Sequence, residues 1–375
     1  MRIAVNATIL DERPGGLGVY TAYIIKELAE LGAELRVFTS APATVGVVPI
    51  RRVPKTVRPS RGALGHLARI SWSQAIFPTR AKREKADVSF ITTPTEGATM
   101  PRIPQVVTVH DLLPLKFPDE FPRIGVFFRK VLPGILNNST AIIVPSESTK
   151  KDCVEAYGLE PAKMFVVPEG FAAEFSPNSP EPAIARVKAR WGIESYFLYV
   201  GSILPHKNIA GMLEAYALAS KKTANPLVIV GRKDPRFYPA LARKAASLGI
   251  VDRVKFLDYV PFDTLHDLYR AATAFVFPSF YEGFGLPILE SMASGLPVIS
   301  SNSSSMPEVA GDAACLFDPA DRKACADAMI RIATDKKWHA ELKAKGLLWM
   351  RQFSWDKAGK ATLAVLEGAA KMGKS

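Results

Sequence analysis

The chain alternates between short runs of β-branched residues and longer runs with apolar residues at helical spacing, in two successive series. In the first series the strand-like runs are RIAVNA, ELRVFTS, ADVSFIT, QVVTVHD and TAIIVPS, and helical spacing appears in VYTAYIIKELAELG. Short apolar runs bounded by turn or charged residues are typical of parallel sheets covered by helices on both faces. The pattern predicts a doubly wound α/β fold for the first half of the chain.

The second series follows the Pro-rich, acidic segment PEGFAAEFSPNSPEPA, the best candidate for a linker. Its strand-like runs are YFLYVGS, PLVIVGR, RVKFLDYV, AFVFPS, GLPVISS and AACLFD, with helical runs between them. The chain length of 375 residues also exceeds the roughly 150 residues of a typical domain. We therefore expect two Rossmann-like domains, residues 1–175 and 176–354, and a terminal helix at 355–375.

Composition excludes several classes of protein. Hydrophobic residues make up 48% of the chain and charged residues 22%, as in a globular protein. The amino terminus MRIAVNATIL has too short an apolar run for a signal peptide, and no stretch reaches the roughly 18 apolar residues of a membrane span. Cys153, Cys315 and Cys325 form no CxxC pair, so we interpret them as buried thiols and expect no zinc site. A soluble, cytoplasmic protein is expected.

Positive charge is concentrated between Arg51 and Lys85, a segment that contains ten Lys or Arg residues and a single acidic residue, Glu84. We call this segment the basic window. Its middle, GALGHLARISWSQAIF, could form a helix with Leu64 and Leu67 among its apolar positions, which suits an anionic membrane surface or a phosphorylated acceptor. A solvated basic surface is the alternative. Nucleic acid is not expected, because no binding-module signature accompanies the charge.

In each series, one glycine-containing turn follows the first strand. Gly15 and Gly16 open a helix, where backbone N–H groups can meet an anion. Because the motif is not GxGxxG, a dinucleotide is disfavoured, and a tight turn without a ligand is the alternative. In YVGSILPHKNI, Gly201 and Lys207 lie between a strand and a helix expected from about Asn208. A lysine at this edge of the sheet can reach a pyrophosphate.

The stretch YEGFGLPILE places two glutamates, Glu282 and Glu290, eight positions apart. A helix from about Pro287 to Ser294 would put Glu290 in its first turn and Glu282 in the preceding loop. Gly283 and Gly285 would let the backbone approach a ligand closely. Carboxylates beside a phosphate site suit the binding of sugar or ribose hydroxyls. A capping glutamate and a solvated one are the alternative.

The run PSFYEGFGLPILESMASGLPVISSNSSSMPEVAGDAACLFDP resembles the signature block of glycosyltransferase family 4, whose hallmark is E-x7-E. GGLGVY, VVTVHDLLPLKFP, IIVPSESTKKD, VVPEG, YVGSILPHKN and FSWDKAGKATLAVLE match the family in the expected order. The resemblance implies a GT-B fold, in which parallel sheets of two Rossmann-like domains face each other across a cleft. It also implies an N-terminal acceptor-binding domain that is completed by residues 355–375, and a C-terminal domain that binds a nucleotide sugar.

Roles for individual residues follow from the resemblance alone. Glu290 would hold the ribose hydroxyls, Glu282 the sugar hydroxyls, and Lys207 the diphosphate, while His110 would lie near the primary hydroxyl of the sugar and the acceptor. The implied catalytic residues are Lys207, Glu282 and His110. The implied nucleotide-sugar-binding residues are Gly15, Gly16, Gly201, His206, Lys207, Arg232, Tyr259, Val260, Glu282, Gly283, Phe284, Gly285, Leu286 and Glu290.

Three positions depart from the family pattern. Related sequences often carry Arg where this chain has His206, and many carry Arg where it has Ser202. Arg232, or a protonated His206, could replace the missing phosphate cation. Glu169 stands where Asn is usual, which leaves the detail of the hinge in doubt.

The resemblance implies transfer of a hexose with retention of anomeric configuration, without a metal ion or a resident cofactor. HDLLPLKFPDEF favours mannose from GDP-mannose, and UDP- or dTDP-sugars are alternatives. The acceptor would be a glycan or a lipid-diphosphate-linked sugar in polysaccharide synthesis, at the inner face of the membrane. The rival functions are an epimerase or phosphorylase on the same fold, and a basic binding protein without catalytic activity.

Overall fold

The structure is a computed structural model that describes residues 1–12, 15–41, 46, 48–177 and 183–373. It divides into two compact units, Met1–Gly170 with Ser354–Ser375, and Phe171–Phe353. The first boundary lies five residues before the one expected from the sequence. Part of the linker candidate, residues 178–182, lies outside the described residues.

Within the described residues, the first unit has a seven-stranded parallel sheet in the order β3-β2-β1-β4-β5-β6-β7. The strands are β1 (Arg2–Asn6), β2 (Glu34–Thr39), β3 (Ile50–Arg52), β4 (Val88–Ile91), β5 (Gln105–Thr108), β6 (Ala141–Val144) and β7 (Met164–Val166). The sequence patterns identified all of them except β3 and β7, which form the two edges of the sheet.

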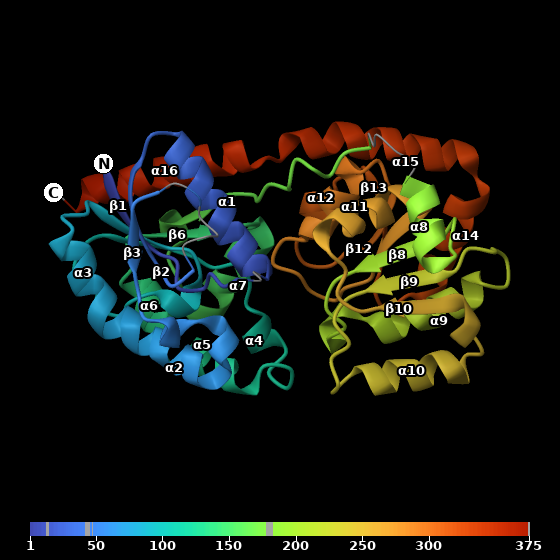
Figure 1. The fold of residues 1–375 in the computed structure, drawn as a ribbon, viewed down its shortest axis with the longest axis horizontal. Helices are drawn as coiled ribbons and strands as arrows, with labels where there is room; N and C mark the ends of the chain where they lie inside the picture. The colour runs from blue at the N-terminus through green and yellow to red at the C-terminus, as the bar shows by residue number, and fades with distance from the viewer. Residues whose placement is uncertain (13–14, 42–45, 47, 178–182, 374–375) are drawn as a thin grey trace. The chain divides into compact units, whose positions relative to one another are not determined.

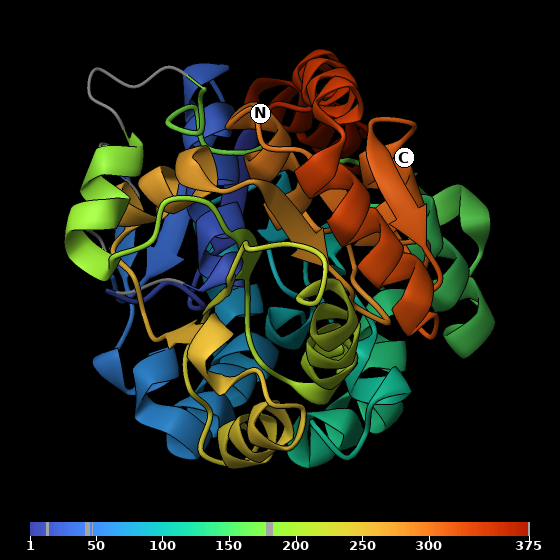
Figure 2. The same cartoon turned by 90° about the vertical axis from the view of Figure 1, so that its right-hand side faces the viewer.

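Helices lie on both faces of this sheet (Figures 1 and 2). They are α1 (Gly16–Glu30), α2 (Gly62–Ser71), α3 (Phe77–Arg83), α4 (Leu113–Lys116), α5 (Pro122–Lys130), α6 (Leu132–Asn137), α7 (Glu147–Tyr157) and α16 (Trp355–Met372). A π-helical turn, Trp72–Ile76, joins α2 to α3. The chain therefore returns to the first unit with its last helix.

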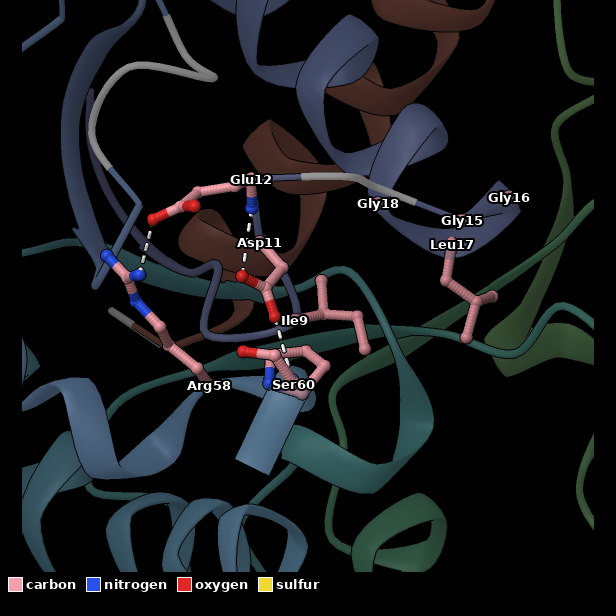
Figure 3. A pocket seen from close by; sticks show the side chains of 10 residues that line it. Ile9, Asp11, Glu12, Gly15, Gly16, Leu17, Gly18, Arg58 and Ser60 are labelled. Atoms are coloured by element: carbon pink, nitrogen blue, oxygen red, sulfur yellow. Dashed lines mark hydrogen bonds and ion pairs between the residues drawn. The ribbon is translucent and has the colours of Figure 1, made fainter. Parts of the chain in front are cut away.

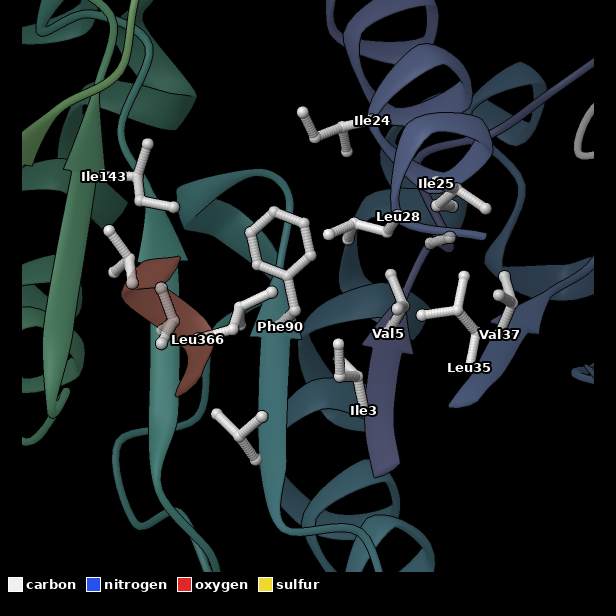
Figure 4. Packing of buried hydrophobic residues seen from close by; sticks show 14 of the residues in the cluster. Ile3, Val5, Ile24, Ile25, Leu28, Leu35, Val37, Phe90, Ile143 and Leu366 are labelled. Carbon is white, nitrogen blue, oxygen red and sulfur yellow. The ribbon is translucent and has the colours of Figure 1, made fainter. Parts of the chain in front are cut away.

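The core of the first unit has two layers because alternate residues of a strand point to opposite faces. Ile3 and Val5 of β1 pack in one cluster, together with α1 and α16, as Figure 4 shows around Leu28 and Leu366. Ala4 belongs to the cluster on the other face, with helices α5 and α6. Burial of these side chains stabilises the unit by roughly 1.5–3 kcal/mol for each large apolar residue.

The described part of the second unit has a six-stranded parallel sheet in the order β10-β9-β8-β11-β12-β13. Its strands are β8 (Phe197–Val200), β9 (Leu227–Val230), β10 (Val254–Leu257), β11 (Ala274–Phe277), β12 (Val298–Ser301) and β13 (Ala314–Phe317). Its helices are α8 (Ala183–Trp191), α9 (Ile209–Ala219), α10 (Tyr238–Ser247), α11 (Phe262–Ala271), α12 (Leu286–Ala293), α13 (Met306–Ala310), α14 (Arg322–Thr334) and α15 (Lys336–Trp349). Both units are Rossmann-like, as expected.

Two smaller observations bear on the class of protein. None of the helices in the described parts of the chain is both long and apolar enough to span a membrane. Cys153 and Cys325 are buried thiols, but Cys315 is only partly buried, so the expectation of burial was wrong for it.

Candidate active site

Lys207 is held at the carboxyl edge of the second sheet by a compact turn. After β8, a short 3₁₀ helix, Pro205–Lys207, leads into α9 through Asn208. The side-chain amide of Asn208 donates to the carbonyl oxygens of Pro278 (3.1 Å) and Pro319 (2.9 Å). Since Pro278 follows β11, this amide ties the Lys207 turn to the loop that carries Glu282.

Close packing of backbone fixes the same edge of the sheet. A Cβ atom on Gly231, after β9, would lie 1.9 Å from the carbonyl oxygen of Gly201, after β8. A side chain at Gly231 is therefore excluded, and the two strand ends meet backbone to backbone. This explains Gly201 as part of the site's framework; contact with a nucleotide stays a prediction.

Lys207 and Glu282 form a buried ion pair. The ammonium Nζ lies 2.6 Å from Oε1 and 2.7 Å from Oε2 of Glu282, whose residue is 8% exposed. The hydroxyls of Ser304 and Ser305 donate to the backbone carbonyl of Glu282, at 2.5 and 3.0 Å. Ser305 also donates to the carbonyl of Phe284 (2.7 Å). The two serines thus fix the backbone of the loop, while the carboxylate of Glu282 contacts Lys207.

Helix α12 begins at Leu286 rather than Pro287 and ends at Ala293 rather than Ser294. Glu290 is thus its fifth residue and lies just beyond the first turn, which corrects the expected position. Gly285 precedes the helix with φ +113°, a left-handed conformation that favours glycine. No side chain of the described residues caps this N-terminus. The amides of Gly285 and Leu286 therefore suit an anion.

Glu290 has a different environment from Glu282. Its Oε2 accepts a hydrogen bond from the hydroxyl of Tyr269 in α11, at 2.9 Å. Burial raises the pKa of Glu290, the Tyr269 hydrogen bond lowers it in part, and the resulting value is about 7. Burial, with the nearby Glu290 charge, keeps the pKa of Tyr269 well above its usual value, so this phenol stays a donor. Glu290 can therefore titrate near neutral pH.

The remaining predicted residues of this unit are distributed around the edge of the sheet. Gly283 and Phe284 are buried, and Phe284 packs edge-on against Phe353, with 6.1 Å between ring centroids. Arg232, two residues beyond β9, is exposed, as is Tyr259, and Val260 is partly exposed. Their contacts with a phosphate or a base stay predictions.

The suggestion that a protonated His206 replaces the missing phosphate cation is not supported. His206 is 2% exposed. Burial, together with the charge of Lys207, lowers the pKa of its ring to about 3. The ring is neutral at neutral pH, and Lys207 is the cation that this turn supplies.

In the first unit, His110 follows β5 and lies among polar partners. Its Nδ1 is 3.0 Å from Oε1 of Glu169, and its Nε2 is 2.9 Å from the carbonyl oxygen of Thr92. The ring of Tyr20 meets it edge-on at 4.5 Å between centroids. Burial lowers the pKa of His110, but the Glu169 hydrogen bond and charge outweigh it and the net shift is upward. No motif in the sequence indicates this partnership, although Glu169 stands out as a departure from the family pattern.

His110 lines a cavity of about 310 Å³ whose walls are mainly apolar. Glu169 is not among the residues that line this cavity. The cavity's lining residues are Ile9, Leu17, His66, Arg69, Thr93, Pro94, Thr95, His110, Asp111, Leu113, Pro114, Phe121, Ile124 and Phe128. An apolar cavity with a few convergent polar groups is the usual form of a small-molecule site.

Gly15 and Gly16 line a second cavity of the first unit, of about 660 Å³ (Figure 3). Space is open around both glycines, because a Cβ atom on either would meet nothing within 4 Å. Across the cavity, Arg58 binds the carboxylate of Glu12 at 2.7 Å, and the amide of Ser60 donates to Asp11 at 2.7 Å. The start of α1 thus borders a pocket, and contact of its amides with a phosphate stays a prediction.

Some of the cations in the basic window are engaged in contacts within the protein. Arg51 binds Glu84 in a bidentate manner, at 2.6 and 2.9 Å, while Arg69 donates to the carbonyl of Val57 and is 7% exposed. The exposed cations of the window are Arg52, Lys55, Arg61, Arg80, Lys82, Arg83 and Lys85. Leu64 and Leu67 of α2 are 77% and 60% exposed, so the window contains exposed apolar side chains as well as exposed cations.

In the described parts of the chain, no three His, Cys, Asp or Glu side chains converge as a set of metal ligands would.

Two comparisons with family models match most of the chain. Residues 14–175 match the model described as Glycosyltransferase Family 4, and residues 184–349 match the model described as Glycosyl transferases group 1.

Individual proteins resemble the chain in sequence or in fold. O-antigen chain mannosyltransferase B of Escherichia coli is 33% identical over 267 residues, which cover 69% of this chain and 68% of that protein. O-antigen chain mannosyltransferase RfbU of Salmonella typhimurium is 33% identical over 190 residues, but the match covers only 51% of this chain and 50% of that protein. The fold resembles that of sucrose-phosphate synthase from Thermosynechococcus elongatus, with a TM-score of 0.78, 21% identity and 98% coverage of both chains.

Proposed function

Because this chain belongs to the glycosyltransferase family of those two models and has its GT-B fold, we propose that it transfers mannose from GDP-mannose to a hydroxyl group of a glycan or lipid-linked acceptor. The choice of mannose is supported by two relatives that are O-antigen mannosyltransferases, each 33% identical to this chain. Such an activity would serve the synthesis of a cell-surface polysaccharide such as the O-antigen of lipopolysaccharide.

The observation that carries the proposal is the arrangement of Lys207, Glu282 and Glu290 at one edge of the second sheet. Lys207 would lie against the diphosphate of the donor, and the amides of Gly285 and Leu286 would donate to the same phosphates. Glu282 would accept hydrogen bonds from hydroxyls of the sugar, and Glu290 from hydroxyls of the ribose. A nucleotide sugar needs these three kinds of contact together.

The proposed reaction retains the anomeric configuration. The bond between the anomeric carbon and the phosphate oxygen breaks, and the acceptor oxygen bonds to the same face of that carbon. The acceptor's hydroxyl proton passes to the leaving phosphate oxygen, so no side chain has to act as a base. Lys207 and the backbone amides stabilise the charge that develops on the phosphate, a contribution that is usually large in catalysis. We propose that neither a metal ion nor a resident cofactor takes part.

A donor screen tests the proposal. The thermal midpoint of the full chain is measured with GDP, UDP, dTDP and their sugars, because a ligand that binds the folded state raises it. Transfer from each stabilising donor is then measured with lipid-linked acceptors, with and without EDTA. We expect GDP and GDP-mannose to stabilise the protein, and transfer to persist in EDTA. Stabilisation by UDP or dTDP alone would replace the proposed donor, and loss of transfer in EDTA would refute metal independence.

We further propose that the exposed part of the basic window binds the anionic membrane surface on which a lipid-linked acceptor lies. Exposed leucines and exposed cations within one short segment are typical of segments that bind membrane surfaces. Binding to vesicles with and without phosphatidylglycerol tests this. Leu64→Ser with Leu67→Ser should weaken binding to anionic vesicles, while the same change at the exposed Leu218 and Leu348 should not. Equal binding to neutral vesicles, or equal loss in both double variants, would contradict the proposal.

A further inference from the structure

The pairing of His110 with Glu169 and Thr92 determines how many protons the histidine ring carries. A carbonyl oxygen has no proton to donate, and an ionised carboxylate has none either. A neutral imidazole has one N–H group, so one of its nitrogens would set a lone pair against an acceptor. When Glu169 is ionised, only the doubly protonated ring satisfies both contacts, with Nδ1–H donating to Glu169 at 3.0 Å and Nε2–H donating to Thr92 at 2.9 Å.

We propose that Glu169 is a positioning residue that keeps His110 as an imidazolium, so that His110 acts on the ligands of the first unit as a fixed positive charge and not as an acid or a base. Both N–H groups are committed to protein acceptors and cannot exchange a proton with a substrate without breaking a buried contact. The effect on transfer rests on the proposed function, whereas the protonation state of the ring does not.

The two members of the His110–Glu169 pair lie differently with respect to the cavity. His110 lines the cavity of about 310 Å³, and Glu169 does not. The positive end of the pair therefore faces the cavity, and the carboxylate lies behind it. His110 is 8% exposed and Glu169 is 5% exposed, so solvent screens the pair weakly. A partly negative group of a sugar ligand, such as a hydroxyl oxygen, would be attracted to this wall.

Other charged groups near the His110 ring act on its protonation in both directions. Asp111, next to His110 in the chain, also favours the protonated ring. Arg69 of α2 lines the same cavity, and its like charge opposes a protonated ring. Burial lowers the pKa of His66, which also lines the cavity. The phenol of Tyr20 meets the ring edge-on, and burial keeps it un-ionised with a pKa far above neutral pH. The carboxylate of Glu169 contacts the ring nitrogen Nδ1 directly, so among the nearby charged groups it affects the ring most strongly.

The experiment measures the charge on the ring directly. The chain has five histidines, so ¹⁵N-labelled imidazole signals are assigned with His110→Gln, and their shifts are followed from pH 5 to 9 without ligand. In the wild-type protein we expect both His110 nitrogens to stay protonated above the pH at which an ordinary histidine loses its proton, because the net shift of its pKa is upward. In Glu169→Gln we expect the proton affinity of His110 to fall at least about tenfold, one pKa unit, and Glu169→Asp should restore most of it.

Transfer assays supply the second readout. In Glu169→Gln, kcat should fall about tenfold per pH unit above the new pKa of His110, while KM for the donor changes little. In the wild type this descent should lie at higher pH. Glu160→Gln, the same change at an exposed glutamate of the same unit, should alter neither property.

Three outcomes would overturn the proposal. The first is a neutral His110 ring in the wild type at pH 7, which includes the case in which the proton resides on Glu169. The second is an unchanged titration of His110 in Glu169→Gln. The third is a pH profile of kcat in Glu169→Gln that is the same as in the wild type. If no nucleotide sugar supports transfer, the proposed function fails, but the titration still decides the charge of His110. Circular dichroism of each variant checks that it is folded.

Discussion

Each unit contains a buried pair of a nitrogen base and a carboxylate beyond the ends of its strands, and these two pairs, Lys207–Glu282 and His110–Glu169, are built differently. Lys207 directs its ammonium group at both oxygens of one carboxylate, Glu282. His110 has only two N–H groups, in fixed directions, and Glu169 and Thr92 occupy both. A lysine has three rotatable donors on a flexible stem. The Lys207 pair can therefore rearrange around an incoming phosphate, whereas the His110 pair is suited only to holding a charge in place.

Removing the movable cation should have the largest effect. In Lys207→Ala we expect kcat to fall roughly 10²–10³-fold, as when a stabilising donor is lost from a transition state, with the protein still folded. Steady-state transfer measures this. Lys244→Ala is the matched control, because Lys244 also pairs with a glutamate of the second unit, Glu214. Near-normal transfer in the first variant, or an equal loss in the control, would show that Lys207 has no special role.

Removing the partner of that cation should separate binding from transfer. In Glu282→Gln the ammonium loses its counter-charge and becomes available to phosphate. We expect the nucleoside diphosphate to bind about tenfold more tightly, or ~1.4 kcal/mol, while transfer slows because a contact with the sugar is weakened. Calorimetry and transfer assays measure the two effects. Weaker diphosphate binding in this variant would mean that Glu282 does not compete with phosphate for Lys207.

Glu290 should make binding of the nucleotide depend on pH. Its pKa of about 7 is above the usual value for a carboxyl group, so the group is increasingly protonated as the pH falls through 7. A protonated carboxyl accepts hydroxyl hydrogen bonds less well, and we expect nucleotide affinity to fall about tenfold per pH unit well below the pKa. Glu290→Gln should abolish this part of the dependence. Identical pH profiles in the two proteins would contradict the assignment.

The same carboxyl group should affect stability in the ligand-free protein. A raised pKa in the folded state means that this state holds its proton more tightly than the unfolded chain. The contribution of Glu290 to the free energy of unfolding therefore falls as the pH rises from about 4.5 to about 7. We subtract the thermal midpoint of the wild type from that of Glu290→Gln at each pH. This difference should be larger at pH 8 than at pH 4.5. No change in this difference with pH would place the pKa near its ordinary value.

The smallest effect is expected at Tyr269. Tyr269→Phe removes the hydroxyl that donates to Glu290 and so raises the pKa of that carboxyl further. We expect nucleotide affinity at pH 7 to fall about fivefold, in keeping with the ~1 kcal/mol of a typical hydrogen bond, and to recover at higher pH. Tyr196→Phe is the control, because its hydroxyl donates to the carbonyl of Leu268 instead. A loss that is the same at all pH values would indicate a structural role only.

Sequence patterns predicted the fold well because strand interiors and helix faces are marked by their apolar residues. The missed strands, β3 and β7, have three residues each and are partly exposed, so neither has a buried run to recognise. In β3 the charges of Arg51 and Arg52 hid the strand within the basic window. Edge strands of this kind depend on pairing with a neighbour more than on their own composition.

Within the candidate site, motifs indicated candidate residues but not the residues that contact them. Lys207, Glu282 and Glu290 were singled out by spacing and resemblance, and the structure brings Lys207 and Glu282 into contact. Tyr269 is 21 positions from Glu290, and Glu169 is 59 positions from His110. Such pairs arise only when distant elements pack together. The protonation of His206 was misjudged for the same reason, since its burial depends on the whole fold.

The return of α16 to the first unit has a consequence for how the chain folds during synthesis. Trp355 and Leu366 belong to the same apolar cluster as Ile3 and Val5, yet they are synthesised only after the whole of the second unit. The second unit is one continuous segment, Phe171–Phe353, and can complete its core earlier. The domain that is synthesised first is thus finished last, and until then part of its apolar surface is exposed to chaperones and to aggregation.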